Sequence, residues 1–450
     1  MEIVNVIGGG LAGCEAAWQA ARIAARVRLY EMRPAKMTEA HRTAGLAELV
    51  CSNSLRSQEI STGPGLLKKE MEIAGSLIMK AAQNSGVAAG TALAVDRTIF
   101  SSLISDAIES HPLIEIVREE LVSVPTDGAT VIATGPLTSG GMAQTIKTMI
   151  GEDDLYFYDA IAPILASESI DESRVYRSSR YGKGGDDYVN CPMSMSEYNT
   201  FLDALLEADS VAAREFEDIK VFEGCMPVEV MARRGRDTLR FGPLKPVGLP
   251  DPRTGSVPYA VVQLRPENRE RTAYNMVGFQ TRLRQQDQKA VFSLIPGLDS
   301  AEFFRFGSIH RNTYINSPRH LNRDLSIKSP AAGELRGPKV FLAGQITGVE
   351  GYIESAAIGF LAGISAALDV RGQAFPVPPR ASAHGSLLAH LIDSDPEHFV
   401  PSNINFGLLP ADNALPRLRD KRMRRQRLAE NAFAQWSNYI DMLKKEYDFR

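Results

Sequence analysis

The chain has 450 residues, a formal net charge of −4, 44% hydrophobic residues and 23% charged residues. This composition is typical of a globular protein with a large core, and it excludes collagen-like and broadly disordered classes. The length predicts two or three domains, or one nucleotide-binding domain that carries a large insertion. Because the net charge is slightly acidic, any contact with nucleic acid must come from local basic patches.

The N-terminal segment MEIVNVIGGG lacks the basic-then-apolar pattern of a signal peptide, and no run of 18 apolar residues predicts a membrane span. We therefore expect a cytoplasmic enzyme. The four cysteines are Cys14, Cys51, Cys191 and Cys225. They form no CxxC pair, so no zinc or other metal site is expected, and in the cytoplasm they should be reduced thiols.

A glycine loop near the N-terminus predicts a dinucleotide site. A short buried strand over residues 3–7 leads into the loop, and an alanine-rich helix over residues 14–25 and a second strand over residues 27–30 follow. The residues expected to face the cofactor are those of the loop and the glutamate that ends the second strand: Gly8, Gly9, Gly10, Leu11, Ala12, Gly13 and Glu31. A glycine-rich turn in an α/β domain that binds no nucleotide is the alternative interpretation.

Each residue type in this unit has a physical role. Gly8 permits a tight turn, and Gly10 lets backbone N–H groups approach a pyrophosphate at the positive end of the helix. Gly13 allows close packing of helix on strand, and Glu31 can bind ribose hydroxyls. The packing of small residues around Cys14 predicts a structural thiol there.

Two distant segments favour FAD over NAD. Residues 129–135 and 339–344 read as strands, and the second continues as AGQITGVEGYIESAAIGFLAG, in which Gly348 and Gly351 lead into a helix. A second helix N-terminus could direct its dipole at an isoalloxazine ring. The arrangement resembles the FAD domain of glutathione-reductase-type flavoproteins, which both chain ends build around an insertion.

We therefore predict an α/β fold with a glutathione-reductase-like, Rossmann-type FAD domain and an α+β insertion domain. The FAD domain should comprise residues 1–150 and 310–450, and the insertion residues 151–309. Within the insertion, residues 159–169 resemble strand, 177–185 a polar loop and 194–208 a helix. Residues 221–249 mix β-favouring residues, prolines and cations, which indicates sheet and loops. This insertion should present the substrate site.

Basic residues gather in three clusters. The first contains Arg233, Arg234, Arg236, Arg240 and Lys245, the second contains Arg265, Arg269, Arg271, Arg282 and Arg284, and the third spans residues 417–428. The third cluster begins a long helix whose apolar face should include Leu428, Phe433, Trp436, Ile440 and Leu443. Local lysines and arginines can contact RNA phosphates, and a solvated helix packed on the domain by its apolar side remains an equal alternative.

Two cysteines lie in segments that could make them reactive. Cys51 lies in LVCSNSLRS, among small polar residues and close to Arg56. Cys225 lies in EGCMP, where the flanking Gly and Met-Pro predict a loop, and four arginines and a lysine follow within twenty residues. Nearby cations stabilise a thiolate and so improve a nucleophile. On local composition alone, an ordinary buried or loop cysteine is the commoner case.

Several motifs together resemble one family. They are NVIGGGLAGCEAAW, LYEMRP, ELVCSNSLRS, ALAVDR, ATGPLTS, NCPM, FEGCMPVEVMARRG, LRFGPLKPVGL, IPGL, HRNTYINSP and LAGQITGVEGY. The chain resembles, over most of its length, the bacterial folate- and FAD-dependent tRNA uracil-5-methyltransferases. Related flavin-dependent wobble-uridine enzymes share the glycine-loop opening.

This resemblance implies a reductive methylation. Methylenetetrahydrofolate would donate the carbon, FAD would supply electrons, NAD(P)H would recharge the flavin, and the product would be 5-methyluridine in the T-loop of tRNA. Carbon 5 of uracil becomes nucleophilic once a thiolate adds to carbon 6. The resemblance assigns that attack to Cys225 and places Cys51 beside the flavin, where it supports carbon transfer. No metal and no membrane are implied.

The resemblance also adds binding residues. Arg33, Gly344, Gly351 and Tyr352 join the expected cofactor site. The target base must be extruded from the tRNA elbow, and contacts by arginines would offset that cost. The candidates closest in sequence to Cys225 are Arg233, Arg234 and Arg236, for which surface ion pairs are an equal alternative.

Three competing functions remain open. A wobble-uridine enzyme would use the same FAD domain but should have a longer chain, and a flavin-binding RNA-interaction protein would have incidental thiols. A general NAD(P)H oxidase would leave the arginine clusters unexplained. His310 could face the folate or flavin or be a structural histidine, Cys191 has no expected role beyond packing, and no residue is identified as the base for the carbon-5 proton.

Overall fold

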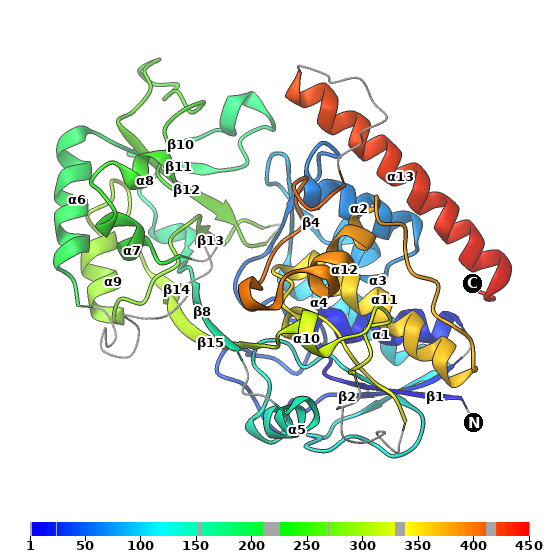
Figure 1. The fold of residues 1–450 in the computed structure, drawn as a ribbon. Coiled ribbons are helices and arrows are strands. Elements are labelled where there is room, and N and C mark those ends of the chain that lie inside the picture. Colours follow the sequence, from blue (N-terminus) through cyan, green and yellow to red (C-terminus); the bar gives the residue numbers. More distant parts are fainter. Residues whose placement is uncertain are drawn as a thin grey trace.

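The computed structural model describes residues 2–23, 25–151, 155–209, 226–268, 270–328, 338–410 and 420–449. Its centre is a five-stranded parallel sheet that both halves of the chain build (Figure 1). The strand order is β16 (Val340–Leu342), β7 (Ala129–Ile132), β1 (Ile3–Ile7), β2 (Arg26–Tyr30) and β6 (Ile114–Val117). The central strands β1 and β7 are buried throughout, in keeping with their mostly apolar sequences, IVNVI and ATVI.

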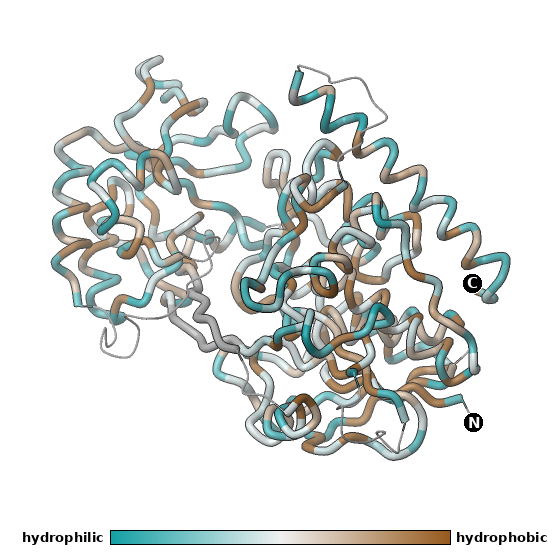
Figure 2. Tube along the Cα trace, viewed as in Figure 1, coloured by the Kyte–Doolittle hydropathy of each residue, from teal (hydrophilic) through white to brown (hydrophobic). Residues whose placement is uncertain are grey.

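Two helices pack closely against each other beside this sheet. They are α1 (Leu11–Arg22) and α11 (Tyr352–Val370). A Cβ atom on Gly359 would lie 2.2 Å from the carbonyl oxygen of Ala12, so the two backbones approach to a distance that admits only glycine there. By length and hydropathy α11 could cross a membrane, but its most apolar window is 83% buried inside the fold. Figure 2 shows hydrophobic residues concentrated in the elements around the parallel sheet.

The other helices of this part surround the sheet and a small antiparallel sheet. The helices are α2 (Gly63–Ile73), α3 (Leu77–Asn84), α4 (Arg97–Glu109), α5 (Gly140–Ile150), α10 (Ser317–His320), α12 (Ala383–Asp393) and α13 (Lys421–Glu446). The small sheet has the order β3 (Ser54–Ser57), β5 (Ala92–Val95), β4 (Gly86–Val87). On α13, Trp436, Ile440 and Leu443 are buried as expected, and the Trp436 indole N–H donates to the carbonyl oxygen of Glu70 at 2.7 Å.

The middle of the chain forms a second hydrophobic core around a six-stranded antiparallel sheet. The order is β10 (Tyr176–Arg177), β11 (Val189–Met193), β12 (Ala260–Pro266), β13 (Ala273–Met276), β9 (Ile164–Ala166) and β14 (Phe303–Arg305). Helices α6 (Met195–Glu207), α7 (Val228–Arg233), α8 (Thr238–Phe241) and α9 (Gln285–Phe292) contribute to the same core. Helix α6 follows the predicted range, and Ser194 and Glu197 form a capping box at its start.

One part of the insertion differs from the expectation of sheet and loops over residues 221–249. In its described portion the chain forms α7 and α8. Pro227 caps α7, and Val228 and Ala232, four residues apart, are buried on the side that packs against α6. This packing outweighs the strand preference of the two valines in VEVMAR, because tertiary contacts override weak local propensity.

A two-stranded ribbon connects the two parts of the molecule. It pairs β8 (Leu155–Ile161) with β15 (Ser308–Tyr314), the points at which the chain leaves the parallel-sheet region and returns to it (Figure 1). The α/β fold class predicted from the sequence, with a Rossmann-type domain assembled from distant segments and an α+β insertion, is confirmed.

Candidate active site

A cavity of about 1020 Å³, counted with its open mouth, lies at the carboxyl ends of β1, β2, β7 and β16. This edge of a parallel sheet is where dinucleotides bind in doubly wound folds. The predicted cofactor residues that line the cavity are Gly8, Gly9, Gly10, Leu11, Ala12, Glu31, Arg33, Gly344 and Tyr352. Two others, Gly13 and Gly351, are not among the lining residues.

The glycines of the loop differ in their surroundings. A Cβ on Gly10 would have no heavy atom within 4 Å, so the backbone here faces open space. A Cβ on Gly13 would lie 1.8 Å from the carbonyl oxygen of Gly8, which only a glycine avoids where helix and strand pack this closely. The first residue therefore leaves room for a ligand, and the second holds the helix against the loop.

Two helix N-termini reach the cavity without side-chain caps. Helix α1 begins at Leu11 and α11 begins at Tyr352, and neither has a side chain that accepts from its first N–H groups. Both starting residues line the cavity. Uncapped N–H groups and the positive ends of two helix dipoles suit an anionic pyrophosphate and an electron-rich ring edge. The arrangement fits FAD.

Glu31 is tied to its neighbours by four hydrogen bonds. Its carboxylate accepts from the Gly9 N–H at 2.9 Å, and from the Arg33 backbone N–H, Nε and Nη2 at 2.9, 2.9 and 3.1 Å. Burial acts to raise the pKa of Glu31, but the hydrogen bonds and charge of Arg33 outweigh it and the pKa is lowered. Ribose hydroxyls would share these oxygens with Arg33, a second function of the carboxylate that sequence reasoning did not include.

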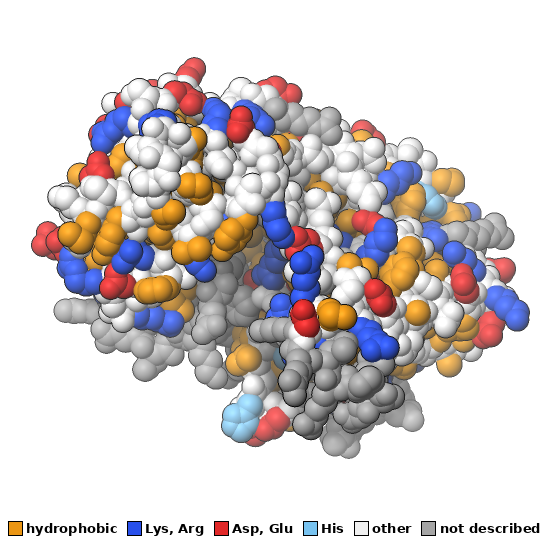
Figure 3. All heavy atoms as spheres, turned by 90° about the horizontal axis from the view of Figure 1, so that it is seen from above, with side chains coloured by type: hydrophobic (Ala, Val, Ile, Leu, Met, Phe, Trp, Pro, Cys, Tyr) orange, Lys and Arg blue, Asp and Glu red, His pale blue; other side chains and the backbone are white. Residues whose placement is uncertain are grey.

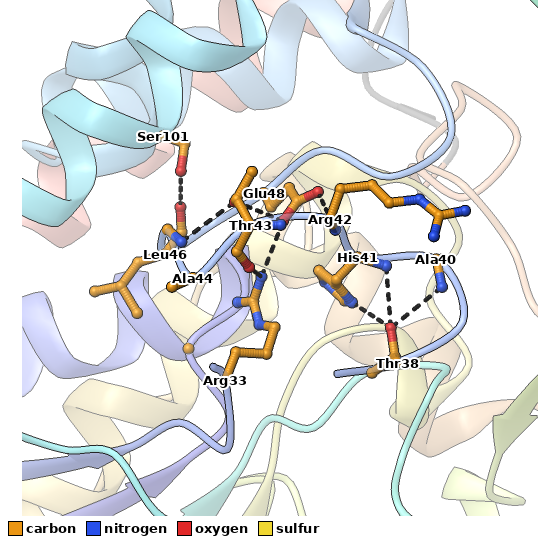
Figure 4. A network of polar contacts seen from close by, with 12 residues as sticks. Arg33, Thr38, Ala40, His41, Arg42, Thr43, Ala44, Leu46, Glu48 and Ser101 are labelled. Atoms are coloured by element: carbon orange, nitrogen blue, oxygen red, sulfur yellow. Dashed lines mark hydrogen bonds and ion pairs between the residues drawn. The ribbon is translucent and has the colours of Figure 1, made fainter. Parts of the chain in front are cut away.

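The loop over residues 38–48 forms a further wall that sequence reasoning missed (Figure 4). Glu48 accepts from the backbone N–H groups of Arg42 and Thr43 at 2.9 and 3.0 Å, and from Arg33 Nη1 at 3.2 Å. His41 Nδ1 lies 2.6 Å from Thr38 Oγ1. Burial and the charge of Arg33 lower the pKa of His41 to about 4, so at neutral pH this cavity residue carries no charge.

Cys51 lies beside Tyr352, one of the lining residues. The Tyr352 hydroxyl oxygen accepts from the backbone N–H groups of Cys51 at 2.8 Å and Ser52 at 3.3 Å, and it lies 2.9 Å from Cys51 Sγ. Because both N–H groups occupy the oxygen's acceptor positions, its own hydrogen is directed at the sulfur. Burial, followed by the nearby Cys51, raises the pKa of Tyr352 well above its usual value, so the hydroxyl stays protonated.

The cations near Cys51 come from elsewhere in the chain than the sequence suggests. Arg56, five residues along, forms an ion pair with the buried Glu354 at 3.7 Å. Instead, Arg97 donates to the carbonyl oxygens of Leu49 and Cys51, and Arg305 donates to that of Val50 at 2.6 Å. Two segments that are distant in sequence therefore reach this loop.

The remaining thiols differ from Cys51. Cys14 and Cys191 are fully buried, and burial raises the pKa of both, which makes them poor nucleophiles. Cys225 lies outside the described residues, and the side chain of His310 is likewise not described. Within the described residues, no group of three His, Cys, Asp or Glu side chains could hold a metal ion.

The three RNA candidates are all exposed but differ in their contacts. Arg236 pairs with Asp203 at 2.7 Å, whereas no ion pair joins Arg233 or Arg234 to another described residue. Phe241, at the end of α8, is 81% exposed. Figure 3 shows basic and acidic side chains interspersed over the face it displays, in keeping with the slightly acidic net charge.

The second basic cluster is not a continuous surface patch. Arg265 is 6% exposed and faces the Cys51 loop, and the Arg282 side chain is 13% exposed and lies 3.6 Å from Glu229. Arg269 lies outside the described residues. Arg265 and Arg282 therefore do not contribute to an RNA-binding surface, since burial keeps both away from a phosphate backbone.

The sheet order, the cavity and the two helix N-termini define a flavoprotein of the glutathione-reductase-like type. The family model described as glucose inhibited division protein A matches residues 3–374. The Geobacter sulfurreducens methylenetetrahydrofolate–tRNA-(uracil-5-)-methyltransferase TrmFO is 57% identical over 438 residues, which is 97% of this chain and 98% of that protein. The Moorella thermoacetica protein of the same name is 54% identical over 435 residues, covering 97% and 98%. The chain belongs to the TrmFO family.

A solved structure has the same fold. Aquifex aeolicus GidA in its form II crystal superimposes with a TM-score of 0.69 at 17% sequence identity, covering 99% of this chain and 74% of that chain. At this identity the similarity establishes the fold alone.

Proposed function

We propose that this protein methylates carbon 5 of a uridine in tRNA, using methylenetetrahydrofolate as carbon donor and FAD as electron carrier. Near full-length similarity to proteins named for this reaction supports the proposal. The observation in the structure that carries it is the Cys51 thiol, hydrogen-bonded at 2.9 Å to a tyrosine that lines the flavin-sized cavity. Bound FAD would supply the electrons that reduce the transferred carbon to a methyl group.

Tyr352 and Cys51 would act together at the flavin end of the cavity. The tyrosine fixes the loop by accepting two backbone N–H groups and directs its hydrogen at Sγ. A sulfur that accepts such a hydrogen bond is better stabilised as a thiolate. Cys51 can thereby supply or accept a proton near the carbon that is transferred.

A second thiol is needed for the base itself. We assign the attack on uracil carbon 6 to Cys225, from its EGCMP motif, and we assign the target to the T-loop of tRNA. NAD(P)H would recharge the flavin, and the reaction would take place in the cytoplasm. Because thiolate addition at carbon 6 turns carbon 5 into an enolate carbon, the two thiols have different partners and are not interchangeable.

The two parts of the chain would divide the work. Residues 1–150 and 310–450 would bind the flavin, and residues 151–309 would hold the RNA. On the insertion, Arg233 and Arg234 are available for phosphates, and Arg236, which pairs with Asp203, would contribute less. The exposed ring of Phe241 could stack on an unpaired base.

The test uses unmodified tRNA transcript, FAD, NADPH and methylenetetrahydrofolate labelled in the transferred carbon. We expect label in 5-methyluridine at the T-loop, and loss of label with Cys51→Ala and with Cys225→Ala. Label at the wobble position would reassign the substrate site. No label in RNA, despite bound and reducible FAD, would refute the methyltransferase proposal.

The division between the thiols has its own test. RNA that carries 5-fluorouracil at the target should trap the cysteine that attacks carbon 6 as a covalent complex. We expect the complex with the unaltered protein and with Cys51→Ala, and none with Cys225→Ala. A complex that survives the Cys225 substitution would show that another thiol attacks the base.

A further inference from the structure

The guanidinium of Arg265, a residue of the insertion, lies against the loop that contains Cys51. It lies on β12 of the six-stranded sheet, yet its guanidinium donates to Asn53 Oδ1 through Nε and to Ser52 Oγ through Nη2, both at 2.9 Å. Asn53 in turn donates to the carbonyl oxygen of Pro266 at 3.0 Å, so strand and loop hold each other. The residues on either side of the contact are more than two hundred positions apart in the chain.

Three guanidinium groups surround this loop, and in the described part of the chain one carboxylate pairs with them. Glu267 accepts from Arg97 Nε at 2.5 Å. Arg265 and Arg305 instead donate to neutral oxygens, those of Asn53, Ser52 and Val50. Burial of cations without enough opposite charge is costly, so the loop favours an additional negative charge.

The Cys51 sulfur is placed to provide that charge. Burial is the largest influence on the pKa of Arg97, Arg265 and Arg305 and acts to lower it, while the charge of Cys51 acts to raise it in all three. Attraction is mutual, so the same three cations favour the thiolate over the thiol. The Tyr352 hydroxyl on α11 lies 2.9 Å from the sulfur, and the carboxylate of Glu267, which pairs with Arg97, acts in the opposite sense to the three cations.

We propose that Arg265, with Arg97 and Arg305, is a positioning residue that holds Cys51 as a thiolate, so that seating of the insertion against the FAD domain sets the reactivity of this thiol. The importance of that thiolate for carbon transfer rests on the function proposed above. The ionisation itself does not, because the proton passes to solvent and the charge stays between fixed cations.

The experiment follows alkylation of each cysteine by iodoacetamide against pH in the full-length FAD-bound protein. Trypsin cleavage places the four cysteines on four different peptides, so mass spectrometry reads Cys51 alone on residues 43–56. We expect Arg265→Gln to raise the pH midpoint for Cys51 alkylation by about one unit, the effect of removing a charge partner. Arg265→Lys, which keeps the charge, should keep the Cys51 midpoint close to that of the unaltered protein.

Two internal controls keep the result interpretable. Cys191 is buried on β11, whose ladder partner is β12, so its continued protection reports that the insertion remains folded. Arg253→Gln removes a cation that lies in the insertion and pairs with Asp251, and it should leave the Cys51 midpoint unchanged. If Arg265→Gln exposes Cys191, Arg305→Gln on β14 becomes the deciding variant, with the same expected shift.

An unchanged midpoint with Cys191 protected would overturn the proposal. So would an equal shift in Arg253→Gln, because it would show a general loss of positive field. Methylation is not measured in this titration. A failed labelled-folate assay therefore leaves the thiolate proposal standing, and an unchanged titration leaves the methylation proposal standing.

Discussion

Replacing Tyr352 with Phe removes a single oxygen atom that makes three contacts. The backbone N–H groups of Cys51 and Ser52 lose their acceptor, and Cys51 Sγ loses a hydrogen-bond donor. A hydrogen bond to a charged acceptor contributes roughly 1.5–3 kcal/mol. At 1.36 kcal/mol per pKa unit, this predicts a rise of about one to two units in the pKa of the Cys51 thiol.

The assay is the pH dependence of Cys51 alkylation, read on its own tryptic peptide, together with single-turnover methylation at pH 7 and at pH 9. We expect the variant to be slow at pH 7 and to recover at pH 9, because the higher pH restores the thiolate. Tyr188→Phe is the matched control, since that hydroxyl donates to the carbonyl oxygen of Ala89 at 3.0 Å and does not contact Cys51. Equal alkylation midpoints in the variant and the unaltered protein would refute the reasoning.

Three further predictions concern the cofactor loop, a buried lysine and the RNA surface. Gly13→Ala should lower both the melting temperature and the FAD content, because overpacking at this position costs about 1–3 kcal/mol. Gly10→Ala should lower the FAD content alone, since the space at this position is open. Equal melting temperatures of the two variants would contradict this distinction. Burial lowers the pKa of Lys68 from 10.5 to about 8, so the unfolded chain binds more protons between these values. In urea titrations, the free energy of unfolding relative to that of Lys68→Met should therefore rise by about 3 kcal/mol from pH 8 to pH 10.5. Parallel dependences of this free energy on pH in the two proteins would contradict the prediction. Reversing the charge of Arg233 and Arg234 together should weaken tRNA binding and flatten its salt dependence by about one to two in slope, and an unaltered slope would remove both from the interface.

Much of the FAD domain could be predicted from the sequence because its signals are local. The first strand, the glycine loop, the helix and the second strand follow one another within thirty residues. The spacing of the glycines within this unit is shared by few other structures. Helix α1 begins at Leu11 and ends at Arg22, earlier at both ends than predicted, because the glycine loop itself supplies the first helical turn. The glycine-led helix at Tyr352 could be predicted for the same reason.

The surroundings of Cys51 could not be predicted, because no local pattern records them. Arg97, Arg265 and Arg305 reach the loop from α4, β12 and β14, and only the tertiary fold brings these elements together. Charge alone groups Arg265 with the other arginines of its cluster, whereas its place near the end of the largely apolar strand AVVQLRP indicates burial. Short helices such as α7 are missed for a related reason, since packing against α6 decides their conformation.

The split origin of the cavity has a consequence for how the protein is made. Its glycine loop leaves the ribosome almost at once, but Tyr352 and the rest of α11 follow about 340 residues later. Until then the parallel sheet lacks β16 and the apolar face of α1 lacks its partner. The insertion, whose sheet strands lie between Ile164 and Arg305, can bury its own core earlier. The cofactor can therefore bind only at the last stage of synthesis. A nascent chain that stalls before α11 would have a folded insertion but an incomplete FAD domain without cofactor.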